Sequence, residues 1–263
     1  DGNIIQQIDI TDNNSSNGIV NTVPPRLSLV TADTTTTFPY AGGYVYFTDM
    51  EGGMWKVNLS GSGTLYETTR LFDAESTYNN DRMCFHNLTP TILSDGSLMH
   101  FFGTADMNRI GRVSGDIENR IYGVNDQNYP SYAAVGSPYT VSNMQNNTTE
   151  NVCPGANQKG WYMNLDSNEK VTANATVRDS TVIFSRYTPN STNVCSAGSA
   201  KISEHDFACG TTFREIDLGV GMATEAIIYK DKIFIGVSSD TPDQGSLPAG
   251  FVKQGNLIIG TPY

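Results

Sequence analysis

The sequence predicts an all-β protein, a β-propeller or part of one, built from four-stranded antiparallel blades. Short runs of β-branched and aromatic residues alternate with Gly, Asn and Asp along the 263 residues, which is typical of strands and turns. No window of a dozen residues shows the i, i+3, i+4, i+7 apolar spacing of an amphipathic helix. We expect residues 1–263 to form a single propeller domain and to be a fragment of a larger secreted protein. Residues 1–5 resemble the tip of a hairpin whose first strand is missing.

The first group of strands begins with a hairpin. Residues 44–48 and 54–59 are rich in aromatic and β-branched side chains, and the turn 49–53 between them ends in two glycines. Gly52 is suited to this turn because glycine adopts a positive φ without a steric penalty. Residues 65–72 are expected to form the third strand of the group.

Three further groups follow the first. Their expected strands are 88–93, 98–103 and 120–124 in the second group, 160–165, 170–177, 180–187 and 213–218 in the third, and 225–229, 233–237 and 256–260 in the last. The groups recur at roughly 45 to 55 residues, a period that indicates a propeller or a similar array. One such sheet cannot bury both of its faces alone, so neighbouring blades are expected to stack face to face.

Two long segments interrupt the repeat. Residues 135–158 and 189–212 are rich in Asn, Ser and Gly, and both contain cysteine. Their polarity predicts loop insertions held by disulfides, and loops on a rigid frame are where binding usually resides.

The four cysteines are even in number and contain no C-x-x-C pair, which favours disulfides in an oxidising compartment over a metal site. Four cysteines allow three pairings. We expect Cys195 to pair with Cys209, closing a loop of about 15 residues that adds roughly 3 kcal/mol, and Cys84 to pair with Cys153. The alternative is four buried free thiols.

The net charge of the chain argues against nucleic-acid binding, and its hydropathy argues against a membrane-spanning helix. The net charge is −11, from 16 Lys and Arg against 27 Asp and Glu. Nucleic acid is therefore not an expected partner, because its binding depends on clustered cationic side chains. No apolar run approaches the roughly 18 residues of a membrane-spanning helix, so the chain is expected not to span a membrane.

Three stretches resemble one known family. Residues 45–59, Val-Tyr-Phe-Thr-Asp-Met-Glu-Gly-Gly-Met-Trp-Lys-Val-Asn-Leu, resemble the blade motif of the PilC/PilY family of type IV pilus tip-associated adhesins. Phe-Phe-Gly-Thr at 101–104, leading to Asn-Arg-Ile-Tyr-Gly-Val-Asn-Asp at 119–126, resembles the family's FGTG…YGxxD blade. Gly-Trp-Tyr-Met-Asn-Leu at 160–165, continuing through Glu169-Lys-Val and Val182-Ile-Phe-Ser to Pro189 and Cys195, resembles its GWYxxL…ERV…VIFTTxxP…C run.

The resemblance implies a C-terminal β-propeller of a large secreted protein whose N-terminal part often resembles a von Willebrand A domain. It also implies an extracellular position at the bacterial cell surface, at the pilus tip. Minor pilins and a host or surface receptor are the implied partners, with roles in adhesion and in pilus assembly or retraction.

Calcium is possible in this family, but its loop motif is not intact here. The motif alternates oxygen ligands, as Asp-x-Asp-x-Asp/Asn-x-x-x-Asp. The incomplete versions are Asp1, Asn3 and Asp9 with Ile5 in a ligand position, Asp12, Asn14 and Ser16 ending on Val20, and Asp33 followed by four threonines. We therefore expect no cofactor and no metal site.

No catalytic residue is expected. His86, His100 and His205 are isolated in sequence, and neither H-E-x-x-H nor G-x-S-x-G occurs. Trp55 and Trp161 are interpreted as structural blade residues that pack between blades, and Gly52 and Gly103 as structural residues of the same blades.

The function that we expect from the sequence is a non-enzymatic adhesin and pilus assembly module that acts through its loops. The alternatives are a propeller enzyme, either a quinoprotein-like dehydrogenase or a glycosidase, and a purely structural surface protein.

Overall fold

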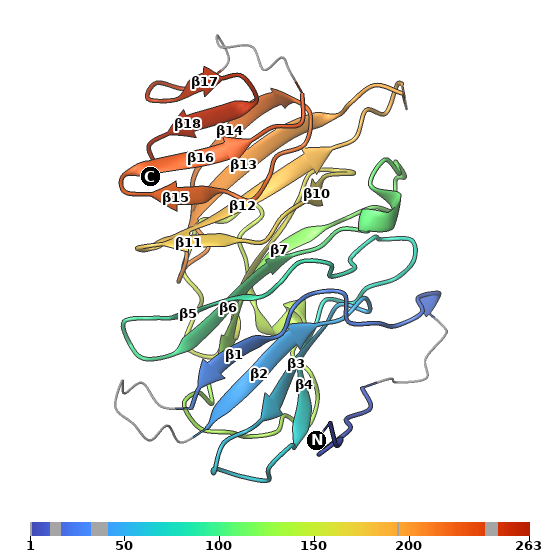
Figure 1. Cartoon of the computed structure of the whole chain (residues 1–263), viewed down its shortest axis with the longest axis vertical. Coiled ribbons are helices and arrows are strands. Elements are labelled where there is room, and N and C mark those ends of the chain that lie inside the picture. Colours follow the sequence, from blue (N-terminus) through green and yellow to red (C-terminus); the bar gives the residue numbers. More distant parts are fainter. Residues whose placement is uncertain (1, 11–16, 33–41, 194, 240–246) are drawn as a thin grey trace.

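The computed structural model describes residues 2–10, 17–32, 42–193, 195–239 and 247–263. The structure is all-β, with 39% strand and 3% helix, as predicted. Four sheets follow one another in chain order along the longest axis of the molecule, from blue to red in Figure 1. The 3-10 helices η2 (Met107–Arg109) and η3 (Val141–Asn143) lie between strands.

The first two sheets comprise β1 to β9. The first has the order β1 (Ser28–Thr31), β2 (Gly43–Thr48), β3 (Gly53–Asn58) and β4 (Thr68–Asp73). The second has the order β5 (Thr89–Ile92), β6 (Leu98–Gly103), β7 (Arg120–Asp126), β9 (Gly160–Asn164) and β8 (Gln145–Asn146). All these pairs are antiparallel except β8 with β9.

The last two sheets comprise β10 to β18. In the third sheet, β10 (Lys170–Val171) and β11 (Thr176–Arg178) both pair with β12 (Thr181–Thr188), which is followed by β13 (Ser199–Asp206) and β14 (Thr212–Val220). The fourth sheet has the order β15 (Ile227–Tyr229), β16 (Lys232–Gly236), β18 (Leu257–Gly260) and β17 (Val252–Gln254). Two sheets thus have the predicted four strands, and the other two have five.

The predicted first hairpin is present, with β2 and β3 paired from Tyr44 opposite Asn58 to Thr48 opposite Met54. The Asp49 carboxylate closes its turn by accepting a hydrogen bond from the Gly53 N–H at 2.7 Å. Gly52 has a φ of +74°, and a Cβ there would lie 2.9 Å from the Cβ of Ala74. Glycine therefore meets both the backbone and the space requirement of this turn.

Residues 160–165 were expected to open the third group of strands, and this is wrong. The strand β9 pairs with β7, from Arg120 opposite Asn164 to Val124 opposite Gly160, and so belongs to the second sheet. The long segment between the two strands leaves the sheet and returns to it. Proximity in the sequence therefore did not indicate which sheet this strand would join.

The predicted loop insertion 189–212 is also wrong in its middle part, because Ser199–Asp206 form β13, which lies between β12 and β14. Buried polar side chains on β13 made the segment look like a loop. Glu204 is fully buried, and its Oε1 accepts a hydrogen bond from Arg214 Nη2 at 2.8 Å. The other predicted insertion, 135–158, contains only η3 and the two-residue β8 among regular elements.

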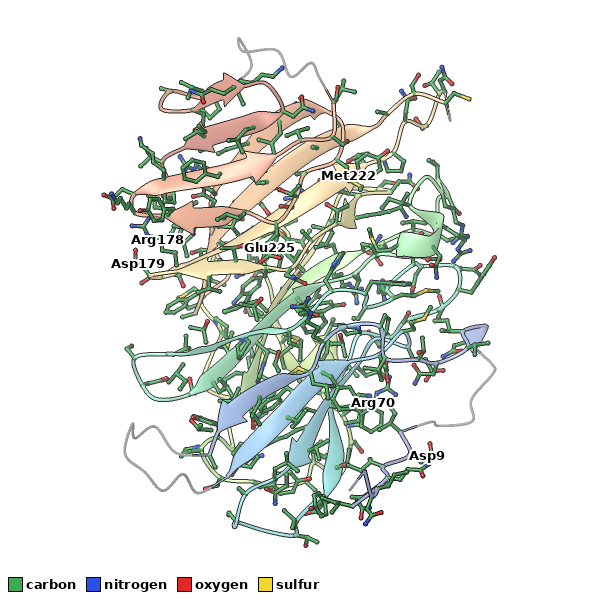
Figure 2. The ribbon with its side chains drawn as sticks, viewed as in Figure 1. Asp9, Arg70, Arg178, Asp179, Met222 and Glu225 are labelled. Atoms are coloured by element: carbon green, nitrogen blue, oxygen red, sulfur yellow. A yellow bond between two sulfur atoms is a disulfide. The ribbon has the colours of Figure 1, made fainter. Side chains whose placement is uncertain are left out.

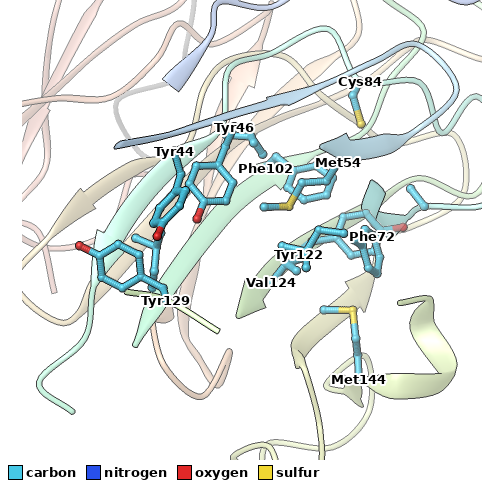
Figure 3. Packing of buried hydrophobic residues seen from close by; sticks show 14 of the residues in the cluster. Tyr44, Tyr46, Met54, Phe72, Cys84, Phe102, Tyr122, Val124, Tyr129 and Met144 are labelled. Atoms are coloured by element: carbon cyan, nitrogen blue, oxygen red, sulfur yellow. The ribbon is translucent and has the colours of Figure 1, made fainter. Parts of the chain in front are cut away.

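Three apolar clusters lie between successive sheets. Tyr44, Met54 and Phe72 of the first sheet meet Phe102 and Tyr122 of the second (Figure 3). The second cluster joins the second and third sheets through Met99, Phe101, Ile121, Trp161, Val171, Val182 and Phe184. The third joins the third and fourth sheets through Ile183, Ile202, Ile216, Leu218, Ile233, Ile235 and Ile258.

The inner sheets are buried on both faces. Along β6, Phe102 packs toward the first sheet and Phe101 toward the third; along β12, Phe184 packs toward the second sheet and Ile183 toward the fourth. Successive side chains of a strand point to opposite faces. A continuous apolar run such as that of β6 therefore supplies two interfaces at once.

The two tryptophans differ in their environment. Trp161 is fully buried between the second and third sheets, and its indole N–H donates to the Phe207 carbonyl at 3.0 Å. Trp55 is only partly buried and lies outside the three clusters of described residues; its N–H donates to Asp49 Oδ2 at 2.7 Å. At Gly103, a Cβ would overlap the side chain of Val171, so this glycine allows the second and third sheets to approach closely.

Replacing Trp161→Ala is expected to lower the free energy of unfolding by about 3–5 kcal/mol, because it opens a cavity between two sheets. Denaturant unfolding followed by circular dichroism measures the loss. Trp55→Ala is the matched control and is expected to cost less, because part of that side chain is already exposed. Equal losses in the two variants would contradict this account of the interface.

Candidate functional site

The edge strands β1, β5 and β11 and the residue before β15 are joined by a recurring hydrogen bond. In each case a hydroxyl at the start of an edge strand donates to the carbonyl that precedes the edge strand of the next sheet. These bonds run from Ser28 Oγ to Leu88 O at 2.9 Å, from Thr89 Oγ1 to Ala175 O at 2.7 Å and from Thr176 Oγ1 to Ala226 O at 2.7 Å. The same junction thus occurs at all three boundaries between successive sheets.

A second polar row lies two residues before each of these positions and contains Arg26, Asn87, Asn174 and Glu225. Asn87 Oδ1 accepts from the Arg26 N–H at 2.7 Å, and Asn174 Oδ1 accepts from the Asn87 N–H at 2.8 Å. Asn174 Nδ2 then donates to Glu225 Oε2 at 2.7 Å. Figure 2 labels Glu225 in the region where the third and fourth sheets adjoin.

This row lines a groove of about 410 Å³ that extends across the four sheet edges. The residues that line it are Arg26, Leu27, Ser28, Asn87, Leu88, Thr89, Pro90, Asn174, Ala175, Thr176, Val177 and Glu225. The groove thus combines a cation, one carboxylate, two amides and several hydroxyl and apolar groups. Such a lining suits a polar ligand held by hydrogen bonds, since a few placed polar groups orient a ligand on apolar walls.

The sequence contains a signal for this edge that periodicity alone does not reveal. The tripeptides Arg26-Leu-Ser, Asn87-Leu-Thr, Asn174-Ala-Thr and Glu225-Ala-Ile occupy equivalent places in the four sheets. Each has a polar residue, then Leu or Ala, then the first residue of the edge strand. Their separations are unequal because the connections between them differ in length, so no fixed period marks them.

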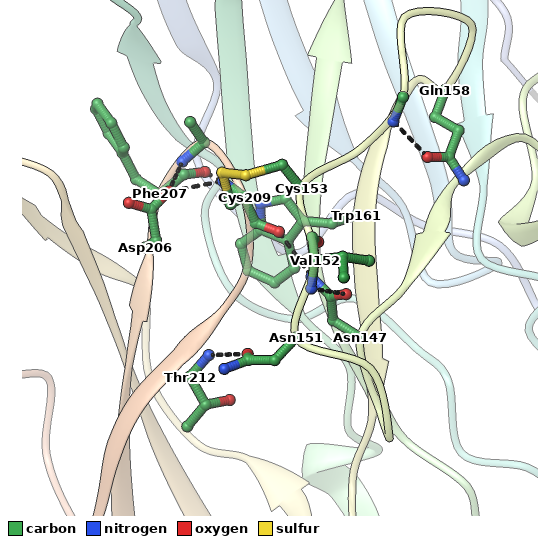
Figure 4. Close-up of a disulfide and its surroundings, with 12 residues drawn as sticks. Asn147, Asn151, Val152, Cys153, Gln158, Trp161, Asp206, Phe207, Cys209 and Thr212 are labelled. Atoms are coloured by element: carbon green, nitrogen blue, oxygen red, sulfur yellow. Dashed lines mark hydrogen bonds between the residues drawn. A yellow bond between two sulfur atoms is a disulfide. The ribbon is translucent and has the colours of Figure 1, made fainter.

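The disulfide in the structure joins Cys153 to Cys209 (Figure 4). Cys209 lies in the turn between β13 and β14, and the segment containing Cys153 lies against this turn. Asn147 Nδ2 donates to the Cys209 carbonyl at 2.6 Å, and Asn151 Oδ1 accepts from the Thr212 N–H at 2.8 Å. The disulfide therefore ties the segment between β7 and β9 of the second sheet to the third sheet. Such a bond is typical of an oxidising compartment.

Both predicted pairings are wrong, since Cys84 and Cys195 are free thiols. Cys195 is exposed in the connection between β12 and β13, whereas Cys209 follows the opposite end of β13. A strand of eight residues spans about 27 Å, far more than the Cα separation of up to about 7 Å that a disulfide bridges. Cys84 is buried between the first two sheets.

The three histidines are not brought together. His100 lies on β6 against Tyr46, and His205 lies on β13 against Trp161 and Phe184. Burial lowers the pKa of His100 and of His205 to about 3, and it also lowers the pKa of His86. All three consequently favour the neutral imidazole, and His100 and His205 are fully buried within the stack of sheets.

Among the described residues, no group of three or more His, Cys, Asp or Glu side chains is arranged to hold a metal ion. Of the incomplete calcium motifs, Asp1, Asp12, Asn14, Ser16 and Asp33 lie outside the described residues, whereas Asn3, Ile5, Asp9 and Val20 lie within them. The described part of the chain also contains no helix long and apolar enough to cross a membrane.

Neither a protein-family model nor a curated protein matches the chain.

Removing the disulfide by the double substitution Cys153→Ser and Cys209→Ser is expected to lower the free energy of unfolding by about 4 kcal/mol, because the bond closes a long loop in the unfolded chain. Chemical denaturation without reductant measures the effect. Cys195→Ser is the control and is expected to leave stability unchanged. A loss of stability in the control would indicate that the predicted Cys195 bond exists in solution.

Acidification is expected to destabilise the fold through the buried histidines. An unfolded histidine titrates near pH 6.5, whereas His100 and His205 titrate at about 3 in the fold. The unfolded chain therefore binds more protons below pH 6.5, and stability falls from there toward pH 3. At pH 5, each of these two histidines is expected to lower the free energy of unfolding by about 2 kcal/mol.

The measurement is the free energy of unfolding at pH 7 and pH 5 for the parent and for His205→Gln. The variant is expected to lose less stability over this interval. An identical loss in both proteins would contradict the assignment of His205 as a neutral buried side chain.

Proposed function

We propose that this chain is a non-enzymatic propeller-type module of a type IV pilus tip protein, active in adhesion and in pilus assembly or retraction. The observation that carries the proposal is the repeated edge junction. The same hydroxyl-to-carbonyl bond links each sheet to the next, as expected for blades that follow one another around an axis with their first strands innermost.

The outward faces of the two end sheets support a blade-like array. Val45, Phe47 and Val57 of the first sheet line an apolar groove of about 380 Å³ together with residues of the N-terminal segment. On the fourth sheet, Ile227 and Tyr229 are 65% and 64% exposed on the face opposite the cluster with the third sheet. Both outward faces are thus apolar: the N-terminal segment covers much of the first, and the fourth sheet leaves its own exposed.

We propose that binding occurs at the polar segments that connect strands and project from the sheets. The segment 135–158 is tethered by Cys153, and the exposed connection between β12 and β13 extends from the opposite end of the third sheet. Both are rich in Asn, Ser and Thr, which suits adaptable hydrogen bonding with a protein or glycan surface. Minor pilins and a host or surface receptor are the proposed partners.

The groove at the sheet edges favours binding over glycoside cleavage. Among the described residues that line it, Glu225 is the single carboxylate, whereas most glycosidases use a pair of carboxyl groups across the scissile bond. No observation in the described residues favours a quinoprotein-like dehydrogenase. Retention of a quinone cofactor by the purified chain, or turnover of a glycoside, would support an enzyme instead.

The test is binding of the purified chain to the minor pilins of the same organism. The variant Gly136→Asp places a charge in the tethered segment, and Gly115→Asp places the same charge in a different turn. Both glycines are exposed, lack a positive φ and have open space where a Cβ would lie. Gly136→Asp is expected to weaken binding about tenfold, a change of about 1.4 kcal/mol, and Gly115→Asp to leave it unchanged.

Absence of binding by the parent chain would favour a purely structural surface protein and contradict the proposal. Equal weakening by both variants would contradict the role of the tethered segment.

A further inference from the structure

A fully buried ion pair joins the first two sheets. Lys56 lies on β3 and Asp126 ends β7, and Lys56 Nζ lies 2.7 Å from Asp126 Oδ2. Neither side chain has any solvent exposure. Burying two charges in this way is costly unless their surroundings compensate.

Among the described residues, Asp126 is the charged neighbour of Lys56, and the other side chains around its Nζ are aromatic. Its Nζ lies 4.3 Å from the ring centroid of Tyr44 and 5.3 Å from that of Tyr132, and it donates to the Ser131 carbonyl at 3.1 Å. Burial lowers the pKa of Lys56, which favours the neutral amine over the ammonium. Figure 3 shows Tyr44, Tyr46 and Tyr129 grouped at this end of the cluster.

Burial favours the neutral forms of His100 and Tyr139 near Asp126. His100 lies on β6, with its ring centroid 4.1 Å from that of Tyr46, and burial lowers its pKa to about 3. Tyr129 and Tyr139 follow Asp126 in the chain, and burial raises the pKa of Tyr139. The ion pair therefore faces phenols and a neutral imidazole.

Each carboxylate oxygen of Asp126 accepts a different hydrogen bond. The Asn128 N–H donates to Oδ1 at 3.1 Å, and the Tyr46 hydroxyl donates to Oδ2 at 2.8 Å. Burial, reinforced by the charge of Asp126, raises the pKa of Tyr46, so the phenol keeps its proton and remains a donor. The Asn128 N–H is thus placed to stabilise negative charge on Oδ1, and the Tyr46 hydroxyl is placed to assist Oδ2 as a leaving group.

We propose that Lys56 and Asp126 condense to form an intramolecular isopeptide bond, Nζ to Cγ, that covalently joins the first two sheets. The partners, their contact distance and the dry aromatic surroundings are all in place for this reaction. The bond would give this boundary a covalent link, as the disulfide does between the second and third sheets.

The step balances without any further reactant. A proton passes from Lys56 Nζ to Asp126 Oδ2, which leaves a neutral amine beside a neutral carboxylic acid. The amine attacks Cγ while the Asn128 N–H stabilises the charge that develops on Oδ1. A second proton passes from the nitrogen to Oδ2, the bond from Cγ to Oδ2 breaks, and water leaves.

Two physical factors favour the amide. Holding the amine against the acid replaces a bimolecular encounter, and well-oriented intramolecular reactions reach effective molarities of about 10⁵–10⁸ M. The site also excludes the water that would reverse the reaction.

The second buried Lys–Asp pair provides an internal control. Lys170 Nζ also lies 2.7 Å from Asp81 Oδ2, and both side chains are again fully buried. Asp81 Oδ1, however, also contacts Arg109 Nη2 at 3.2 Å and Arg112 Nη1 at 2.6 Å. Three cations stabilise this carboxylate as an anion, and an anionic carboxylate resists attack by an amine, so this pair is expected to remain unlinked.

The experiment is mass spectrometry of the full chain after denaturation and reduction. The parent is expected to be lighter than its sequence by the mass of one water molecule. Proteolysis is expected to release a branched peptide that joins Lys56 to Asp126. Lys56→Met is expected to restore the full sequence mass, whereas Lys170→Met is expected still to lack one water.

The variant Tyr46→Phe keeps the aromatic packing and removes the donor to Oδ2. It is expected to lower the linked fraction at a fixed time after synthesis. A parent chain with its full sequence mass after prolonged incubation would overturn the proposal, and so would a water loss that maps to another pair. The parent measurement requires no substitution, so the outcome does not depend on whether Lys56→Met folds.

Discussion

The requirement that each inner sheet bury both of its faces governs the rest of this structure. A sheet that is apolar on both faces is unstable in water unless other elements cover it, and in this structure the neighbouring sheets do so. Phe101 and Phe102, adjacent on β6, therefore pack into two different clusters. The order of the sheets along the molecule then follows the chain, because each sheet completes the interface that the previous one opened (Figure 1).

Polar groups inside such a stack must find partners within it, since water does not reach them. The pairs Lys56–Asp126 and Lys170–Asp81 do so without any solvent exposure, and the Arg186–Glu169 pair is nearly as buried. Replacing such pairs with apolar residues is often neutral or stabilising, so their value here is geometric. Lys56–Asp126 forms only when the first two sheets are correctly aligned, and Lys170–Asp81 only when the connection between β4 and β5 is placed against β10 of the third sheet.

Local features of the fold could be predicted from the sequence, and long-range ones could not. The hairpin of β2 and β3 depends on adjacent residues and a glycine turn, so it was found with nearly correct bounds. The placement of β9 and the pairing of Cys153 with Cys209 depend on where the long segment between β7 and β9 rejoins the second sheet. Local sequence patterns do not encode this position. The strand β13 was missed because His205 and Glu204 are polar yet buried. The edge groove was missed because its four tripeptides are unequally spaced.

The same requirement indicates where binding can occur. Because the inner sheets use both faces for packing, only their edges and the connections between strands are available to other molecules. Asn87 and Asn174 lie at such edges and are partly exposed, and the tethered segment around Cys153 projects from another. An isopeptide or disulfide link between neighbouring sheets would keep these edges in fixed positions under load, which the proposed adhesive role would require.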